Sequence, residues 1–74
     1  MLTTNNTLIT ARKGANLTQL YAAKKIGVNV RTLRKWEKGI SCPPEYFVDK
    51  MKVLYGVSDL EVITEEQRRK FRLS

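Results

Sequence analysis

Four glycines divide this chain into short segments, and this division limits the fold more than any other feature of the sequence. Gly14, Gly27, Gly39 and Gly56 each follow a segment in which apolar residues recur every three to four positions. That spacing is typical of an amphipathic helix, and glycine is the residue that most often ends one. We therefore expect a compact all-α fold of five short helices.

Residues that commonly open helices stand near the start of most segments. Thr18 and Asn29 are expected N-caps, Pro44 a first-turn residue, and Ser58-Asp59-Leu60-Glu61 a capping box. The expected helices run over residues 5–13, 18–26, 29–38, 44–55 and 58–63. Apolar stripes are expected on the second helix (Ala22, Ala23, Ile26) and on the fourth (Phe47, Met51, Leu54).

Two local alternatives accompany this interpretation. Thr64-Glu65-Glu66-Gln67 offers a second capping box, so the tail over residues 64–74 continues as a helix or frays, and the sequence does not decide which. Residues 26–30 alternate apolar and polar side chains, as a half-buried strand does. The helical spacing on both sides, and the lack of a second strand to pair with it, argue against a strand.

The composition excludes several classes of function. The chain has 74 residues, no histidine and a single cysteine, Cys42. An internal disulfide and the usual zinc sites are therefore excluded, and the common catalytic arrangements lack their base and nucleophile. We expect one domain over residues 1–74, no enzymatic activity, no metal and no cofactor. No leader or long apolar run is present, so we expect a cytoplasmic protein with no membrane partner.

The positive charge is concentrated in the first half of the chain. The net charge is +7, and residues 1–38 carry eight basic side chains and one acidic one, whereas residues 39–74 carry six of each. Such asymmetry is expected when one surface meets a polyanion, although an ordinary solvated face also gives a basic stripe.

The expected third helix divides its charged and apolar residues between opposite faces. At 100° per residue, Arg31, Arg34, Lys35 and Lys38 fall within about 140° of arc from Val30, and Leu33 and Trp36 fall on the other side. Leu33 and Trp36 are thus expected to dock on a core while the cations point outward. An α-helix fits the DNA major groove, where arginine and lysine bond guanine.

Residues 19–38, QLYAAKKIGVNVRTLRKWEK, resemble the helix-turn-helix of the Cro and lambda-repressor-like family, also called the XRE type. Ala23 stands at the family's small position between two helices, Gly27 and Val28 at its turn, and Leu33 and Trp36 at buried positions of its recognition helix. The resemblance implies a lambda-repressor-like fold in which the second and third helices form the helix-turn-helix.

The resemblance extends over about residues 5–63, which we take as the core of the domain. Arg12 and Glu37 match a structural ion pair of the family, and residues 56–60 look like its link into a fifth helix. The single-domain layout looks most like that of a bacteriophage Cro-like regulator, and antitoxins and plasmid regulators share it.

The resemblance also implies a set of DNA contacts. Val30, Arg31 and Lys35 occupy the family's base-contacting positions, and Arg34 flanks them as a base or phosphate contact. Phosphate contacts are expected from Gln19, Asn29, Thr32, Lys38 and Ser41. These contacts position the protein without reading the sequence of the DNA.

Two departures from the family pattern lie in the second helix. Ala22 stands where leucine is usual, and Leu20 and Tyr21 stand where polar residues are usual. One interpretation is local repacking, in which Leu20 or Tyr21 covers Ala22 or meets the tail. The other is a docking patch for a partner protein.

Two functions follow from these observations. The first is a transcriptional repressor that binds a double-stranded DNA operator. A lone domain would bind weakly, so we expect a homodimer on the DNA, formed through the fourth and fifth helices or the tail. The second is a protein-interaction module, an antirepressor, modulator or antitoxin that binds a larger repressor or another partner. Only Leu20 and Tyr21 support the second.

Overall fold

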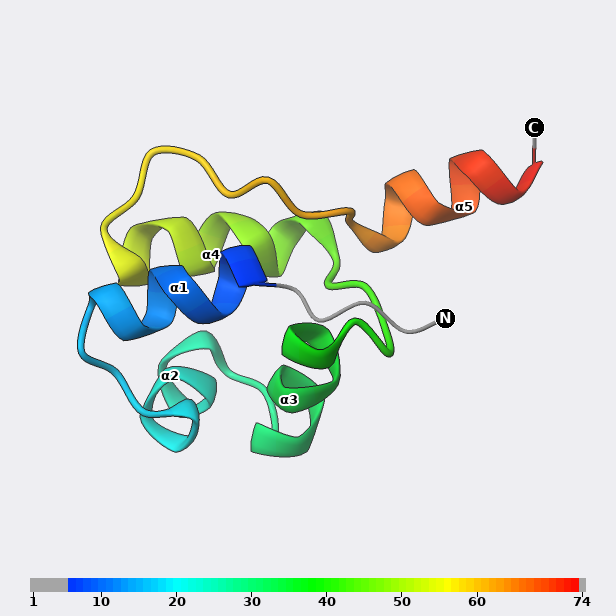
Figure 1. Ribbon diagram of the computed structural model, residues 1–74. Helices are drawn as coiled ribbons and strands as arrows, with labels where there is room; N and C mark the ends of the chain where they lie inside the picture. Colours follow the sequence, from blue (N-terminus) through cyan, green and yellow to red (C-terminus); the bar gives the residue numbers. More distant parts are fainter. Residues whose placement is uncertain (1–5, 74) are drawn as a thin grey trace.

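The computed structural model describes the backbone of residues 6–73 and the side chains of residues 7–70, and this part of the chain is all-α with no strand (Figure 1). The helices are α1 (Asn6–Gly14), α2 (Gln19–Ile26), α3 (Val30–Lys38), α4 (Glu45–Tyr55) and α5 (Glu65–Leu73). The predicted fold class is confirmed. Residue 5, the predicted start of the first helix, lies outside the described residues.

The caps predicted for α2 and α3 are present. The Thr18 hydroxyl accepts a hydrogen bond from the Tyr21 N–H at 3.1 Å, and the Asn29 side chain accepts one from the Arg31 N–H at 2.8 Å. Gly27 ends α2 with a φ of 96°, which L side chains rarely adopt. Residues 26–30 are therefore not one strand. They comprise the end of α2, this left-handed turn and the start of α3, so the strand alternative is wrong.

The core lies between the first four helices. α2 packs on α3 and α4, and α1 packs on the same two helices. The predicted stripe on α2 is buried, but α4 is rotated relative to the prediction: Val48, Met51 and Tyr55 are buried, whereas Phe47 and Leu54 are only partly buried. The buried apolar residues are Leu8, Ala22, Ala23, Ile26, Leu33, Trp36, Val48, Met51, Tyr55 and Leu60.

The predicted helix over residues 58–63 does not form, and this part of the prediction is wrong. The segment runs back along α4 without helical structure, at the top of Figure 1. Leu60 and Thr64 are buried and Val62 is half-buried, whereas Glu61 and Ile63 are exposed. This alternation has the period of extended chain. At about 3.3 Å per residue, an extended segment spans the length of α4, which a short helix at 1.5 Å per residue does not.

The second capping box starts α5 and settles the question of the tail. The Thr64 hydroxyl accepts a hydrogen bond from the Gln67 N–H at 3.2 Å, and the Gln67 side chain accepts one from the Thr64 N–H at 3.1 Å. The Glu65 N–H also donates to the Pro43 carbonyl at 2.9 Å. From this anchor α5 projects beyond the other four helices (Figure 1).

The start of α4 depends on α5. Pro44 occupies the N-cap position rather than the first turn, and it supplies no side-chain hydrogen bond. The Glu66 carboxylate accepts a hydrogen bond from the Glu45 N–H instead, at 3.0 and 3.2 Å from its two oxygens. A carboxylate at a helix N-terminus is favourable because it satisfies a free N–H and complements the helix dipole.

Candidate nucleic-acid interface

α3 is fixed to the core by its apolar side. Leu33 and Trp36 are both buried, and the Trp36 ring lies against the Phe47 ring of α4 with 5.6 Å between centroids. The predicted inward orientation of these two side chains is confirmed. Because they fix the rotation of α3, they also determine which of its residues face solvent.

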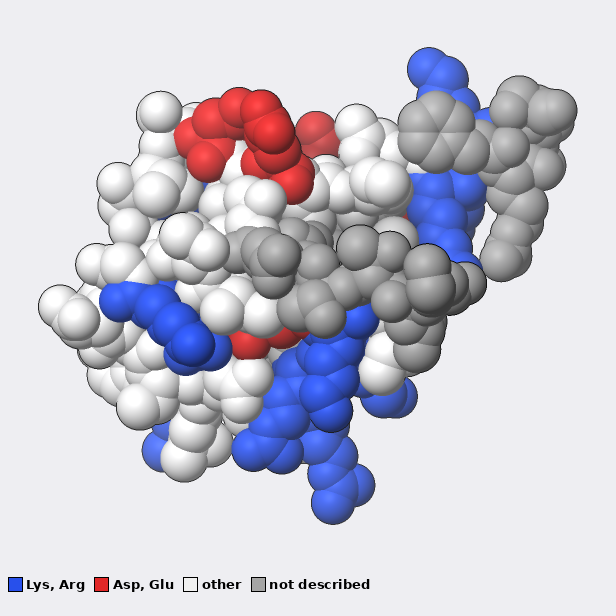
Figure 2. All heavy atoms as spheres, in the orientation of Figure 1, with Lys and Arg blue, Asp and Glu red and all other residues white. Residues whose placement is uncertain are grey.

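The four cations of α3 lie on its solvent face. Arg31, Arg34, Lys35 and Lys38 are all exposed. Figure 2 shows the largest group of Lys and Arg atoms on the visible side at the bottom, where α3 lies, and most of the visible Asp and Glu atoms at the top. Among residues 7–70, no carboxylate forms an ion pair with these four side chains. Their charge is therefore available to a polyanion.

The acidic residue of α3 is turned inward and paired. Glu37 is buried, and Arg12 of α1 donates to its two oxygens at 2.7 and 3.3 Å. Arg12 also donates to the Leu17 carbonyl at 2.8 Å. The predicted ion pair is thus present, and it ties α1 and the loop after it to the C-terminal half of α3.

A hydrogen-bond chain continues from this buried pair to the surface. The Gln19 amide donates to Glu37 Oε1 at 2.8 Å, and its oxygen accepts from Arg34 Nε at 3.2 Å. Gln19 is therefore an internal bridge between α2 and α3, a role that the sequence analysis missed. The amide has a second N–H that this chain of bonds does not use, so the predicted phosphate contact of Gln19 stays a prediction.

The other predicted contact residues differ in how freely they reach outward. Val30 is half-buried against the core, Thr32 and Ser41 are half-buried, and the Asn29 side chain is engaged in capping α3. The Ser41 N–H lies 3.4 Å from the Lys35 carbonyl in the turn that ends α3. The fold therefore gathers the predicted residues around the outer side of α3, with only part of Val30 accessible.

A family model described as helix-turn-helix matches residues 8–62, which is most of the chain. The chain belongs to the helix-turn-helix family of the Cro/C1, XRE-like type. Members are regulatory domains, not enzymes, that bind double-stranded DNA. Comparisons with curated proteins and with solved structures gave no significant match. No helix in the described part of the chain is long and apolar enough to cross a membrane.

The helix-turn-helix carries an exposed apolar pair on α2. Leu20 is 61% exposed and Tyr21 46% exposed, whereas Ala22 is fully buried, and α5 lies at the other end of the molecule (Figure 1). This exposure argues against the expected local repacking, in which Leu20 or Tyr21 covers Ala22 or meets the tail. Lys25 lies over the Tyr21 ring, 5.4 Å from its centroid. A shallow hollow of about 330 Å³ adjoins Tyr21.

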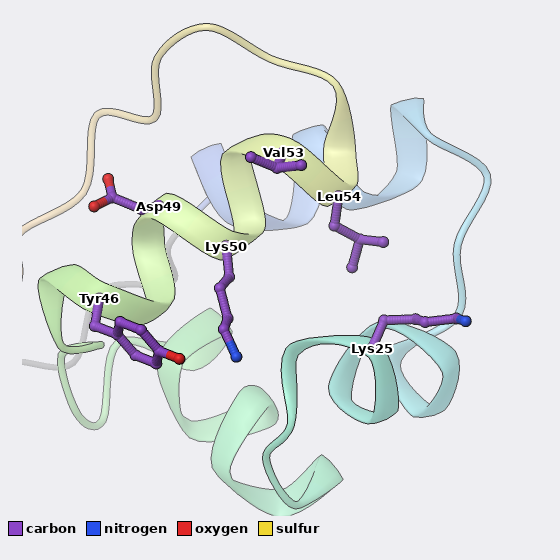
Figure 3. A pocket seen from close by; sticks show the side chains of 6 residues that line it. All are labelled: Lys25, Tyr46, Asp49, Lys50, Val53 and Leu54. Carbon is purple, nitrogen blue, oxygen red and sulfur yellow. The ribbon is translucent and has the colours of Figure 1, made fainter.

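A second surface, on α4, was not expected from the sequence. A shallow hollow of about 620 Å³ lies beside this helix, and Figure 3 shows the side chains that line it. Tyr46 and Val53, which line it, are exposed although they are apolar, and Lys50 lies over the Tyr46 ring at 4.8 Å. The signal available in the sequence was a tyrosine and a valine seven residues apart, outside the predicted stripe. The full lining is Lys25, Tyr46, Asp49, Lys50, Val53 and Leu54.

Proposed function

We propose that this protein is a Cro-like transcriptional repressor that reads operator DNA by inserting α3 into the major groove. The observation that carries the proposal is the division of α3 into a buried apolar side and an exposed cationic side, with its acidic residue Glu37 neutralised inside the fold. An α-helix fits the major groove, where each base pair presents a distinct pattern of donors and acceptors.

The residues of α3 divide into two chemical roles under this proposal. Arg31, Arg34 and Lys35 bond the O6 and N7 atoms of guanine, and the accessible part of Val30 contacts a thymine methyl group. Arg34 is held by Gln19 through Nε at 3.2 Å, so its two terminal nitrogens remain free to point outward. An arginine held in this way loses less side-chain freedom when it binds.

Phosphate contacts surround the base-reading residues. Gln19 and Asn29 lie at the starts of α2 and α3, where helix N–H groups also favour an anion. Lys38 and Ser41 lie at the end of α3 and in the loop after it, and Thr32 lies on α3 itself. These five residues fix the position of the protein on the duplex without selecting its sequence.

Binding to an operator requires more than one recognition helix, because a single helix reads only a few base pairs. We infer that two copies bind half-sites about 34 Å apart, one turn of DNA. The exposed Tyr46 and Val53 on α4 support a contact between copies in that region (Figure 3).

The test begins with selection of binding sites from random duplexes. Wild-type protein is then titrated on the selected duplex and on a scrambled one at several salt concentrations. We expect the selected duplex to bind at least 10³-fold more tightly. Equal affinity for the two duplexes at every salt concentration would refute the proposal.

Variants assign the two roles. Lys35→Ala is expected to reduce discrimination at one base pair by about 1–3 kcal/mol, because it removes a base contact. Lys38→Ala is expected to weaken both duplexes equally and to reduce the salt slope by about 0.9, because it removes a phosphate contact. Lys52→Ala, which removes a lysine of α4, is the control and is expected to change neither.

A second candidate function is supported by Leu20 and Tyr21. An exposed leucine beside an exposed tyrosine is a suitable anchor for another protein, and it makes the chain an antirepressor, modulator or antitoxin. This function predicts that Tyr21→Ala abolishes capture of a larger repressor and leaves DNA affinity unchanged. Loss of DNA discrimination in Lys35→Ala, with no partner captured through Tyr21, would reject it.

A further inference from the structure

α5 is a charged element that the family match does not include. The match ends at residue 62, whereas α5 covers Glu65–Leu73. Its described side chains, residues 65–70, contain no apolar residue, and Arg68, Arg69 and Lys70 are all exposed. The packing of four helices and an extended segment gives no reason for these cations, so another partner must be considered.

The two acidic residues of α5 are used within the protein. Glu66 accepts from the Glu45 N–H at the start of α4, and Glu65 pairs with Arg69 at 2.7 Å. Neither Arg68 nor Lys70 forms an ion pair within residues 7–70. The unpaired charges of residues 65–70 are therefore the cations Arg68 and Lys70 and the Glu66 carboxylate, which keeps its charge while it accepts from a neutral N–H.

The start of α5 is anchored to the loop that follows α3. Its first N–H bonds the Pro43 carbonyl at 2.9 Å, and Pro43 lies in the same loop as Ser41, which follows α3. A rise of about 1.5 Å per residue places the three cations roughly 5–8 Å along α5 from this anchor. In Figure 2 a separate group of Lys and Arg atoms lies at the upper right, where Figure 1 shows α5, away from the acidic group at the top.

We propose that α5 is a second DNA-binding element, which contacts the sugar-phosphate backbone of the duplex flanking the site read by α3. This proposal rests on the proposed DNA-binding function and adds a partner for a surface outside the helix-turn-helix. Charge complementarity favours DNA over a second copy of the chain, because the described side chains of α5 offer cations and no apolar contact. Such a contact adds affinity and not sequence selectivity.

The test compares two variants that lose the same charge. Arg68→Gln with Lys70→Gln removes the two cations of residues 65–70 that form no ion pair, and Lys13→Gln with Lys52→Gln is the control on α1 and α4. Glutamine has a helix propensity close to that of lysine and arginine, so α5 is retained. Circular dichroism and melting curves check that both variants fold.

Binding is measured on a selected duplex with about ten base pairs of flanking DNA, and on the same duplex trimmed to the site under α3. On the long duplex, the α5 variant is expected to lose about 1.8 from the salt slope and roughly tenfold to thirtyfold in affinity, because each phosphate contact contributes about 0.9 to the slope. On the trimmed duplex it is expected to match wild type. The control is expected to keep the wild-type slope on both duplexes.

Three results would overturn the proposal. They are equal slopes for the α5 variant and the control, a loss that persists on the trimmed duplex, and a change of oligomeric state in sedimentation, which would assign α5 to a second copy. The proposed repressor function fails by a different result, the absence of any preference for the selected duplex. In that case the α5 contact is still measured on a long scrambled duplex, because phosphate contacts do not depend on sequence.

Discussion

Replacing Tyr55 by phenylalanine tests the electrostatics of the core. Tyr55 is 5% exposed, and its buried hydroxyl makes no hydrogen bond to any atom of the described residues. Burial raises the pKa of Tyr55 from the ordinary 10.0 to about 12, the Glu37 carboxylate adds to the rise, and the Arg12 guanidinium opposes it. Burial of an ionised phenol next to a carboxylate is unfavourable, so the folded state holds the proton longer.

The raised pKa predicts a loss of stability at alkaline pH. Between pH 10 and 12 the unfolded chain has released the phenolic proton and the folded chain has not, so the free energy of unfolding falls as pH rises. A shift of two units corresponds to about 3 kcal/mol, present in full below pH 10 and lost through pH 12. About half of this loss is expected by pH 11.

The assay is urea unfolding of wild type and Tyr55→Phe, followed by tryptophan fluorescence at pH 7, 9 and 11. At pH 7 the variant is expected to be as stable as wild type or about 1 kcal/mol more stable, because it removes an unsatisfied buried hydroxyl. At pH 11 its advantage is expected to grow by between 1 and 2 kcal/mol. A difference between the two proteins that stays constant from pH 7 to pH 11 would refute the assignment.

Two further predictions concern the attachment of α3. Trp36→Ala is expected to destabilise the protein by about 3–5 kcal/mol, because it leaves a cavity beside Phe47; a normal melting curve would show that the orientation assigned to α3 is wrong. Glu37→Gln is expected to cost about 3 kcal/mol, because Arg12 then stays buried without its counter-charge. The double variant Arg12→Met with Glu37→Met is expected to be more stable than Glu37→Gln in urea unfolding, and equal or lower stability would mean that the buried pair is not coupled.

The sequence predicted the helix-turn-helix well because its signals are local. Thr18 and Asn29 cap the helices that directly follow them, and Gly27 and Gly39 take left-handed conformations just after α2 and α3. The inward side of α3 followed from helical spacing alone. These features depend on residues within a few positions of one another, which is the range that sequence patterns describe.

The features that the sequence missed depend on distant partners. The Ser58–Glu61 capping box is a valid helix start, but burial of Leu60 and Thr64 along α4 favoured the extended form. The contact of Gln19 with Glu37 joins residues 18 apart, and the cap that Glu66 gives to Glu45 joins residues 21 apart. Such contacts follow from how the helices pack, and no spacing rule within one segment contains them.

The chain of hydrogen bonds from Arg12 through Glu37 and Gln19 to Arg34 has an evolutionary consequence. A change at either member of the interior pair frees the side chain that orients Arg34. Under the proposed function, a change in this pair requires a matching change in the operators, so mutations at these positions and in the operator DNA should accumulate together.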